Sequence, residues 1–101
     1  MACLVGQWLT TKDATEETQF ICDQVKDQVL ALTGMNYVAY TAIQYRNQIV
    51  AGENFLIKVD VGEDYNHLSV QHLPKVSGDE FVLRGVEQHR AKEDPLLPFT
   101  K

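Results

Sequence analysis

Apolar residues recur along the first third of the chain with the spacing of an α-helix. The members of this stripe are Ile21, Val25, Val29 and Leu32. Polar side chains fill the positions between them, so the pattern predicts one amphipathic helix over residues 15–33 whose stripe packs into the core. Thr15, or alternatively Asp13, suits the start, because its side chain can accept a hydrogen bond from a free backbone N–H. Gly34 suits a left-handed C-terminal end.

The chain beyond this helix alternates with a period of two, which is typical of β-strands. Residues 54–61 show it most clearly, because an aromatic or β-branched side chain stands at every odd position. The positions between them are largely polar, which predicts a sheet covered on one side only. The expected strands are residues 37–46, 54–61, 67–73 and 81–88.

A helix followed by an antiparallel meander predicts an α+β fold. In this fold one N-terminal helix is wrapped by a four- to five-stranded antiparallel sheet. The chain has 101 residues, which is enough for one domain. We therefore expect residues 1–101 to form a single domain in which residues 1–13, which have no clear period, are a flexible N-terminal arm.

The segment "QIVAG" at residues 48–52 can be interpreted as a buried strand or as a hairpin tip. It falls between two strands that should pair, and Gly52 supplies the backbone freedom of a tight turn, so we expect a tip. A second hairpin follows the third strand, with Leu73-Pro74 at its root. Connections between strands one and two and between strands three and four lie at the same end of a meander. Two apolar tips side by side predict a contact surface.

The formal net charge of −5 argues against nucleic acid or an anionic membrane as a partner, since both need clustered Lys and Arg. No apolar run approaches the ~20 residues of a membrane span. The N-terminal residues make a poor signal peptide, because they lack a basic start and a long apolar stretch. Cys3 and Cys22 are expected to be free thiols in a reducing cytosol.

No constellation of catalytic or metal-binding residues is visible in the sequence. His67 and His72 are five apart on one expected strand, so they should point to opposite faces of the sheet and cannot form a metal pair. Cys22 lies on the expected helix, where a half-buried thiol is an inert packing group. We expect no enzyme activity, no catalytic residue, no metal and no cofactor.

Several short segments together resemble the cystatin family. Gln48, Val50 and Gly52 match the Gln-x-Val-x-Gly motif that cystatins carry at their first hairpin. The segments "ATEETQ", "NFLIKVDVG" and "HLPK" and the ending "PF" are similar to the stefins, the cytosolic branch of that family. One departure is the large pair Trp8 and Leu9 just beyond Gly6, where stefins usually have small and polar residues. Trp8 could add to a contact surface, fold back on the sheet or hinder the arm.

The resemblance implies a tight, reversible inhibitor of papain-like cysteine proteases such as cathepsins. Three segments would form a wedge that occludes the active-site cleft. The corresponding residues are Leu4, Val5 and Gly6 of the arm, Gln48, Ile49, Val50, Ala51 and Gly52 of the first hairpin, and Leu73 and Pro74 of the second. The resemblance also implies a cytoplasmic protein, expected to be a monomer with a domain-swapped dimer as an alternative. The rival hypothesis is a protein-interaction scaffold that has the same fold but does not inhibit proteases.

Overall fold

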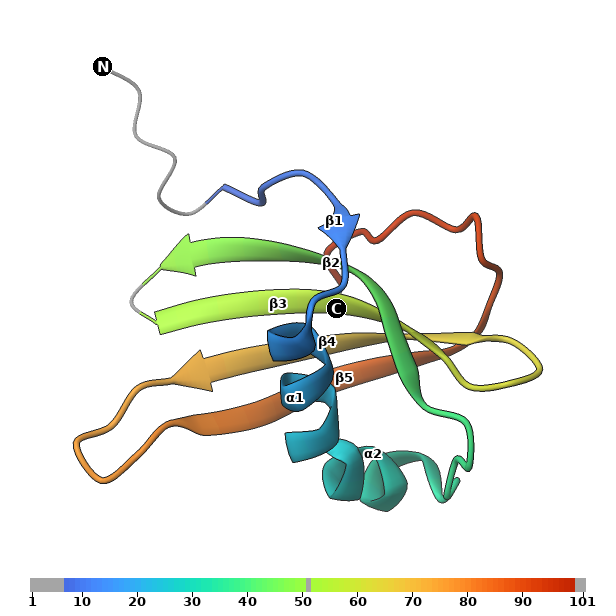
Figure 1. Cartoon of the computed structure of the whole chain (residues 1–101), viewed down its shortest axis with the longest axis horizontal. Coiled ribbons are helices and arrows are strands. Elements are labelled where there is room, and N and C mark those ends of the chain that lie inside the picture. Colours follow the sequence, from blue (N-terminus) through green and yellow to red (C-terminus); the bar gives the residue numbers. More distant parts are fainter. Residues whose placement is uncertain (1–6, 51, 100–101) are drawn as a thin grey trace.

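In the computed structural model, which describes residues 7–50 and 52–99, two helices lie against one antiparallel sheet (Figure 1). The elements in chain order are β1 Lys12–Asp13, α1 Glu16–Gln24, α2 Lys26–Thr33, β2 Thr41–Val50, β3 Gly52–Asp60, β4 Tyr65–Leu73 and β5 Glu80–Arg90. The five strands pair in the order β1-β2-β3-β4-β5. The predicted α+β fold with a meander sheet is confirmed.

The helical region begins and ends as predicted but is divided in two. The Thr15 side chain accepts a hydrogen bond from the Thr18 N–H at 3.2 Å, and Gly34 ends α2 in the left-handed conformation with φ 74°. Val25, at φ −101° and ψ 5°, separates α1 from α2, so the prediction of one continuous helix is wrong. The two segments pack against different strands, α1 against β2 and α2 against β5. A straight helix cannot follow both strands across a twisted sheet, which accounts for the break.

The apolar stripe of the helices enters the core except at its last position. Ile21, Val25 and Val29 are buried and pack with the inner faces of β2, β3 and β4. Leu32 is 62% exposed, so the prediction that it belongs to the core is wrong. It lies beside Leu83 of β5, which is an edge strand of the sheet that the described residues form.

Two glutamine side chains attach the helices to open strand edges. Gln19 of α1 donates from Nε2 to the Tyr40 carbonyl at 3.2 Å and accepts from the Ala42 N–H at 2.8 Å. Gln28 of α2 does the same with the Phe81 carbonyl and the Leu83 N–H, at 3.1 and 2.9 Å. Each amide thus bonds to backbone groups two residues apart, in the way that a neighbouring strand would.

The first long strand starts later than predicted. Residues 37–40 are not part of β2, and Val38 among them is fully exposed. The pairing of β2 with β3 ends at Thr41 and Asp60, because the chain then turns, with the Val61 N–H bonded to the Asp64 carbonyl at 3.1 Å. Residues before Thr41 therefore have no strand to pair with.

The outer face of the sheet is covered as well, so the prediction of a one-sided sheet is wrong. Leu56 and Lys58 of β3 are 1% and 2% exposed. Residues 91–99, which we call the C-terminal strap, are attached there through backbone carbonyls. The Lys58 ammonium donates to the carbonyls of Lys92 and Asp94, and Arg46 donates to that of Leu96. The alternation was misleading because a lysine can be buried when its hydrogen bonds are supplied by the chain.

Candidate functional site

The first hairpin presents its apolar residues at the sheet end. The last register pairs of β2 with β3 are Ile49 with Glu53 and Val50 with Gly52. Ile49 is 49% exposed and Val50 is partly exposed. The prediction that this segment is a hairpin tip and not a buried strand is confirmed, while Ala51 itself lies outside the described residues.

Gly52 joins this tip to the second hairpin. Its φ of 117° is a conformation that side chains disfavour, and a Cβ atom here would lie 2.7 Å from the carbonyl oxygen of His72. The same Cβ would lie 3.7 Å from Cδ of Pro74. The glycine therefore permits both the turn and the close approach of the two hairpins.

The second hairpin ends beside the first, as the strand order predicts. Leu73 is the last residue of β4 and Pro74 the first of the loop that leads to β5. The end of β2 and the start of β3 lie at the left of Figure 1, at the same end of the sheet as the loop between β4 and β5. The loop is closed by a hydrogen bond of 3.1 Å from the Gly78 N–H to the Lys75 carbonyl, and Val76 between them is fully exposed. Val76 is not among the contact residues predicted from the sequence, although an apolar residue within a polar turn is a visible signal.

The part of the arm that the structure describes runs along β2 toward the first hairpin. Trp8 forms an antiparallel bridge with Gln48, and the Leu9 N–H donates to the Asn47 carbonyl at 2.8 Å. Trp8 also lines a hollow of about 500 Å³ over the outer face, together with Leu56, Ser69, Arg84, Pro98 and Phe99. Of the three alternatives for Trp8, the structure shows the one in which it folds back on the sheet. Leu4, Val5 and Gly6 lie outside the described residues.

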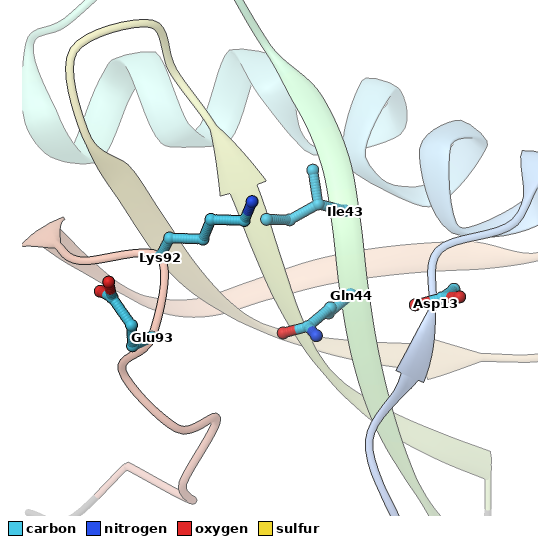
Figure 2. A pocket seen from close by; sticks show the side chains of 5 residues that line it. All are labelled: Asp13, Ile43, Gln44, Lys92 and Glu93. Atoms are coloured by element: carbon cyan, nitrogen blue, oxygen red, sulfur yellow. The ribbon is translucent and has the colours of Figure 1, made fainter.

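A second hollow lies near the start of β2, away from both hairpin tips. Its volume is about 390 Å³, and it is lined by Asp13, Ile43, Gln44, Lys92 and Glu93. Figure 2 shows that the Lys92 side chain extends toward Ile43, while the Glu93 carboxylate points elsewhere. Because its charged groups do not converge on one point, this hollow does not resemble a catalytic or ligand site.

The described histidine and cysteine side chains are not arranged for catalysis or metal binding. His67 is 1% exposed on the outer face, whereas His72 of the same strand stacks on Phe81 on the inner face. Over residues 7–50 and 52–99, no three His, Cys, Asp or Glu side chains are placed to hold a metal ion.

Cys22 is a free thiol with no exposed surface, and burial, followed by the charge of Asp23, raises its pKa to about 12. It is therefore a packing group, because a nucleophilic cysteine must form a thiolate. Cys3 lies outside the described part of the chain.

Comparison with known proteins finds similarity over nearly the whole chain. The cystatin domain matches residues 6–91. Human cystatin-B is 40% identical over 98 residues, which cover 95% of this chain and 99% of that protein. Human cystatin-A is 39% identical over 89 residues, covering 87% and 91% of the two chains. Cystatin-B of Oplegnathus fasciatus is 34% identical over 100 residues, covering 98% of this chain and all of the relative.

No helix in the described part of the chain is long and apolar enough to cross a membrane. The first hairpin carries Gln48, Val50 and Gly52 at the sheet end, and the matched domain includes both hairpins. The chain therefore belongs to the cystatin family of cysteine protease inhibitors, which are not enzymes, and within that family to the stefin branch.

Proposed function

We propose that the chain is a tight, reversible inhibitor of papain-like cysteine proteases, cathepsins among them. It occludes the active-site cleft with the N-terminal arm and the two hairpins. The contacting residues are Leu4, Val5 and Gly6, Gln48, Ile49, Val50, Ala51 and Gly52, and Leu73 and Pro74. The observation that carries the proposal is the position of both hairpins at one end of the sheet, where Ile49 of the first is 49% exposed and Gly52 approaches His72 and Pro74 of the second.

The structure of the tips suits a blocking role. Both loops are held by paired strands, so they lose little conformational entropy on binding and more of the contact energy appears as affinity. Apolar side chains such as Ile49 and Val76 match the apolar subsites of a peptide-binding cleft. A hairpin tip that enters sideways presents no peptide bond in attack geometry, so the inhibitor is not consumed.

We also propose a cellular location and an oligomeric state for the protein. Its similarity to cystatin-B and cystatin-A, together with the free buried Cys22, supports a cytoplasmic protein. We propose that the single domain acts as a monomer and that a domain-swapped dimer is its alternative state.

The test is papain inhibition by Ile49→Asp, with Val38→Asp as the matched control. Val38 is fully exposed, and it precedes β2 at the opposite end of the sheet from the tips. A carboxylate buried without a partner costs roughly 3–5 kcal/mol. The inhibition constant should therefore rise by at least about a hundredfold for Ile49→Asp. It should stay unchanged for Val38→Asp, and both variants should melt close to the wild type.

The interaction-scaffold hypothesis gives a different result in the same assay. It predicts that the wild-type protein leaves papain active at micromolar concentration. If the wild type inhibits and Ile49→Asp inhibits equally well, the hairpin tip is exposed but does not contact the protease, and the proposed site is wrong.

A further inference from the structure

His72 is the residue at which the two hairpins meet. It lies on β4, between its cross-strand partners Glu53 on β3 and Phe81 on β5. Its carbonyl oxygen occupies the space that a side chain at Gly52 would need. Its backbone thus contacts the first hairpin, while its own strand leads directly into Leu73 and the second hairpin.

The imidazole ring of His72 is held from two sides. It stacks on Phe81 with ring centroids 4.8 Å apart and an angle of 16° between the planes. Phe81 in turn meets the Phe20 ring of α1 edge to face at 6.1 Å. On its other side, Nε2 of His72 lies 3.4 Å from a carboxylate oxygen of Asp79 in the second hairpin loop. The ring therefore lies between Phe81, which packs against α1, and the loop of the second hairpin.

The contact between His72 and Asp79 is longer than a hydrogen bond. A hydrogen bond from N–H to oxygen usually spans about 2.7–3.2 Å, and this one is longer. Nε2 is also shielded from water and makes no hydrogen bond with any residue that the structure describes. A protonated imidazole donates from both nitrogens and attracts a carboxylate, so protonation would draw Asp79 closer.

The other charged side chains on the neighbouring strand and loop have partners of their own. The carboxylate of Glu53, the cross-strand partner, accepts a hydrogen bond from the Asn47 side-chain amide at 2.8 Å. The one cation of the loop, Lys75, is ion-paired with Glu80. Histidine is the side chain that ordinarily changes charge between about pH 5 and 8. The loop contact can thus respond to a moderate fall in pH.

We propose that His72 is a pH-responsive positioning residue for the two hairpin tips. In the protonated state it bonds to Asp79 and fixes the second hairpin beside the first. The inhibitor then dissociates from its protease more slowly at acidic than at neutral pH. This inference rests on the proposed function for its effect on inhibition, but the ordering of the loop can be measured without any protease.

The first experiment uses the free protein. The backbone amide signals of Val76 and Gly78 are followed by NMR at pH 5 and pH 7.5. They should move in the wild type and stay in place in His72→Phe, which keeps the aromatic stack but cannot be protonated. His72→Gln is the second variant in case the phenyl ring disturbs folding. Equal movement in the wild type and in both variants would overturn the proposal.

The second experiment is a double-mutant cycle on the dissociation rate from papain at the same two pH values. At pH 5, His72→Gln and Asp79→Asn should each speed dissociation by roughly two- to fivefold, as for a partly exposed ion pair. The double variant should be no faster than either single variant, because both remove the same contact. At pH 7.5 all of these effects should be small.

The chain contains a matched control pair at the opposite end of the sheet. His89 and Asp64 approach to 2.8 Å beside the turn between β3 and β4. His89→Gln and Asp64→Asn should leave dissociation unchanged at both pH values. Additive effects of the His72 and Asp79 variants, or equal effects at both pH values, would overturn the inference. A wild type that does not inhibit papain would overturn the proposed function instead, and the NMR experiment would still decide whether His72 orders the loop.

Discussion

His67 shows how the surroundings of a single residue set its chemistry. Burial, with the positive charges of Lys58 and Arg90 adding to it, lowers the pKa of this imidazole to about 4, although Glu87 and Asp94 oppose the shift. The pKa of Lys58 is itself lowered, chiefly by burial, while Asp94 and Glu93 oppose that shift. Both side chains lie on the outer face as cross-strand partners beneath the C-terminal strap. The folded protein therefore holds His67 neutral where an exposed histidine would already be charged.

This shift predicts an acid-dependent loss of stability that originates at His67. A histidine whose pKa is lower in the folded state contributes stability that is complete above the unfolded pKa of about 6.5 and is lost as the pH falls toward 4. A shift from 6.5 to about 4 corresponds to about 3 kcal/mol at about 1.4 kcal/mol per unit. Urea unfolding at pH 7 and pH 4 should show that His67→Gln loses less stability on acidification than the wild type.

The control for this prediction is His89→Gln, because His89 is 82% exposed. This variant should lose as much stability as the wild type. If His67→Gln and His89→Gln respond equally to acid, the pH dependence arises from the carboxylates and the assignment to His67 is wrong.

At the scale of elements, the positions of the helices depend on polar contacts as well as on the apolar stripe. Gln19 and Gln28 occupy the strand edges that β1 and the other strands leave open. An unpaired strand edge is a site for association with other chains, and these two amides close it at the points they reach. The break at Val25 lets each helix bring its own glutamine to its own strand.

We expect Gln28→Ala to destabilise the protein although alanine is the better helix former. The change leaves the Leu83 N–H and the Phe81 carbonyl without their partner, which should cost about 1–3 kcal/mol in the free energy of unfolding. The matched control is Gln24→Ala, at the exposed end of α1, which should change the free energy by less than about 0.5 kcal/mol. Urea denaturation of both variants measures the difference, and equal stability of the two would contradict the edge-closing role.

At the scale of the whole molecule, stability and the proposed inhibition belong to different regions. The core lies between the helices and the inner face of the sheet, and the strap covers the outer face. Arg46 ties both chain ends to that face, since it donates to the Leu9 carbonyl at 2.9 Å and to the Leu96 carbonyl at 2.7 Å. The hairpin tips lie beyond both regions, at one end of the sheet (Figure 1).

The neighbouring residues Leu96 and Leu97 test this separation. Both belong to the strap, but Leu96 is 2% exposed and Leu97 is 58% exposed. Leu96→Ala should lower the free energy of unfolding by about 2–4 kcal/mol, whereas Leu97→Ala should have little effect. Papain inhibition below the melting temperature should be the same for both variants and the wild type. A loss of inhibition by folded Leu96→Ala would show that the strap and the hairpin tips are coupled.

Local chemistry made much of this protein predictable from its sequence. The side chain of Thr15 and the flexibility of Gly34 act on their own backbone neighbourhood, so they mark the helix ends wherever the segment lies. Consecutive strands joined by short turns pair with one another, which placed residues 48–52 and Leu73-Pro74 at one end of the sheet. The Gln-x-Val-x-Gly motif and the order of elements were enough to indicate the family.

Only the tertiary structure decided the features that depend on segments far apart in the chain. Val25 separates two helices that pack against different strands, β2 and β5, and Leu32 is exposed beside β5, the edge strand of the described sheet. Lys58 was assigned to a solvated face because alternation reports which side a residue faces and not what covers that side. The strap that buries it begins more than thirty residues later, and the contact of His72 with Gly52 joins two separate hairpins. A pattern within one segment carries no information about such partners, because their position is fixed by the packing of the whole chain.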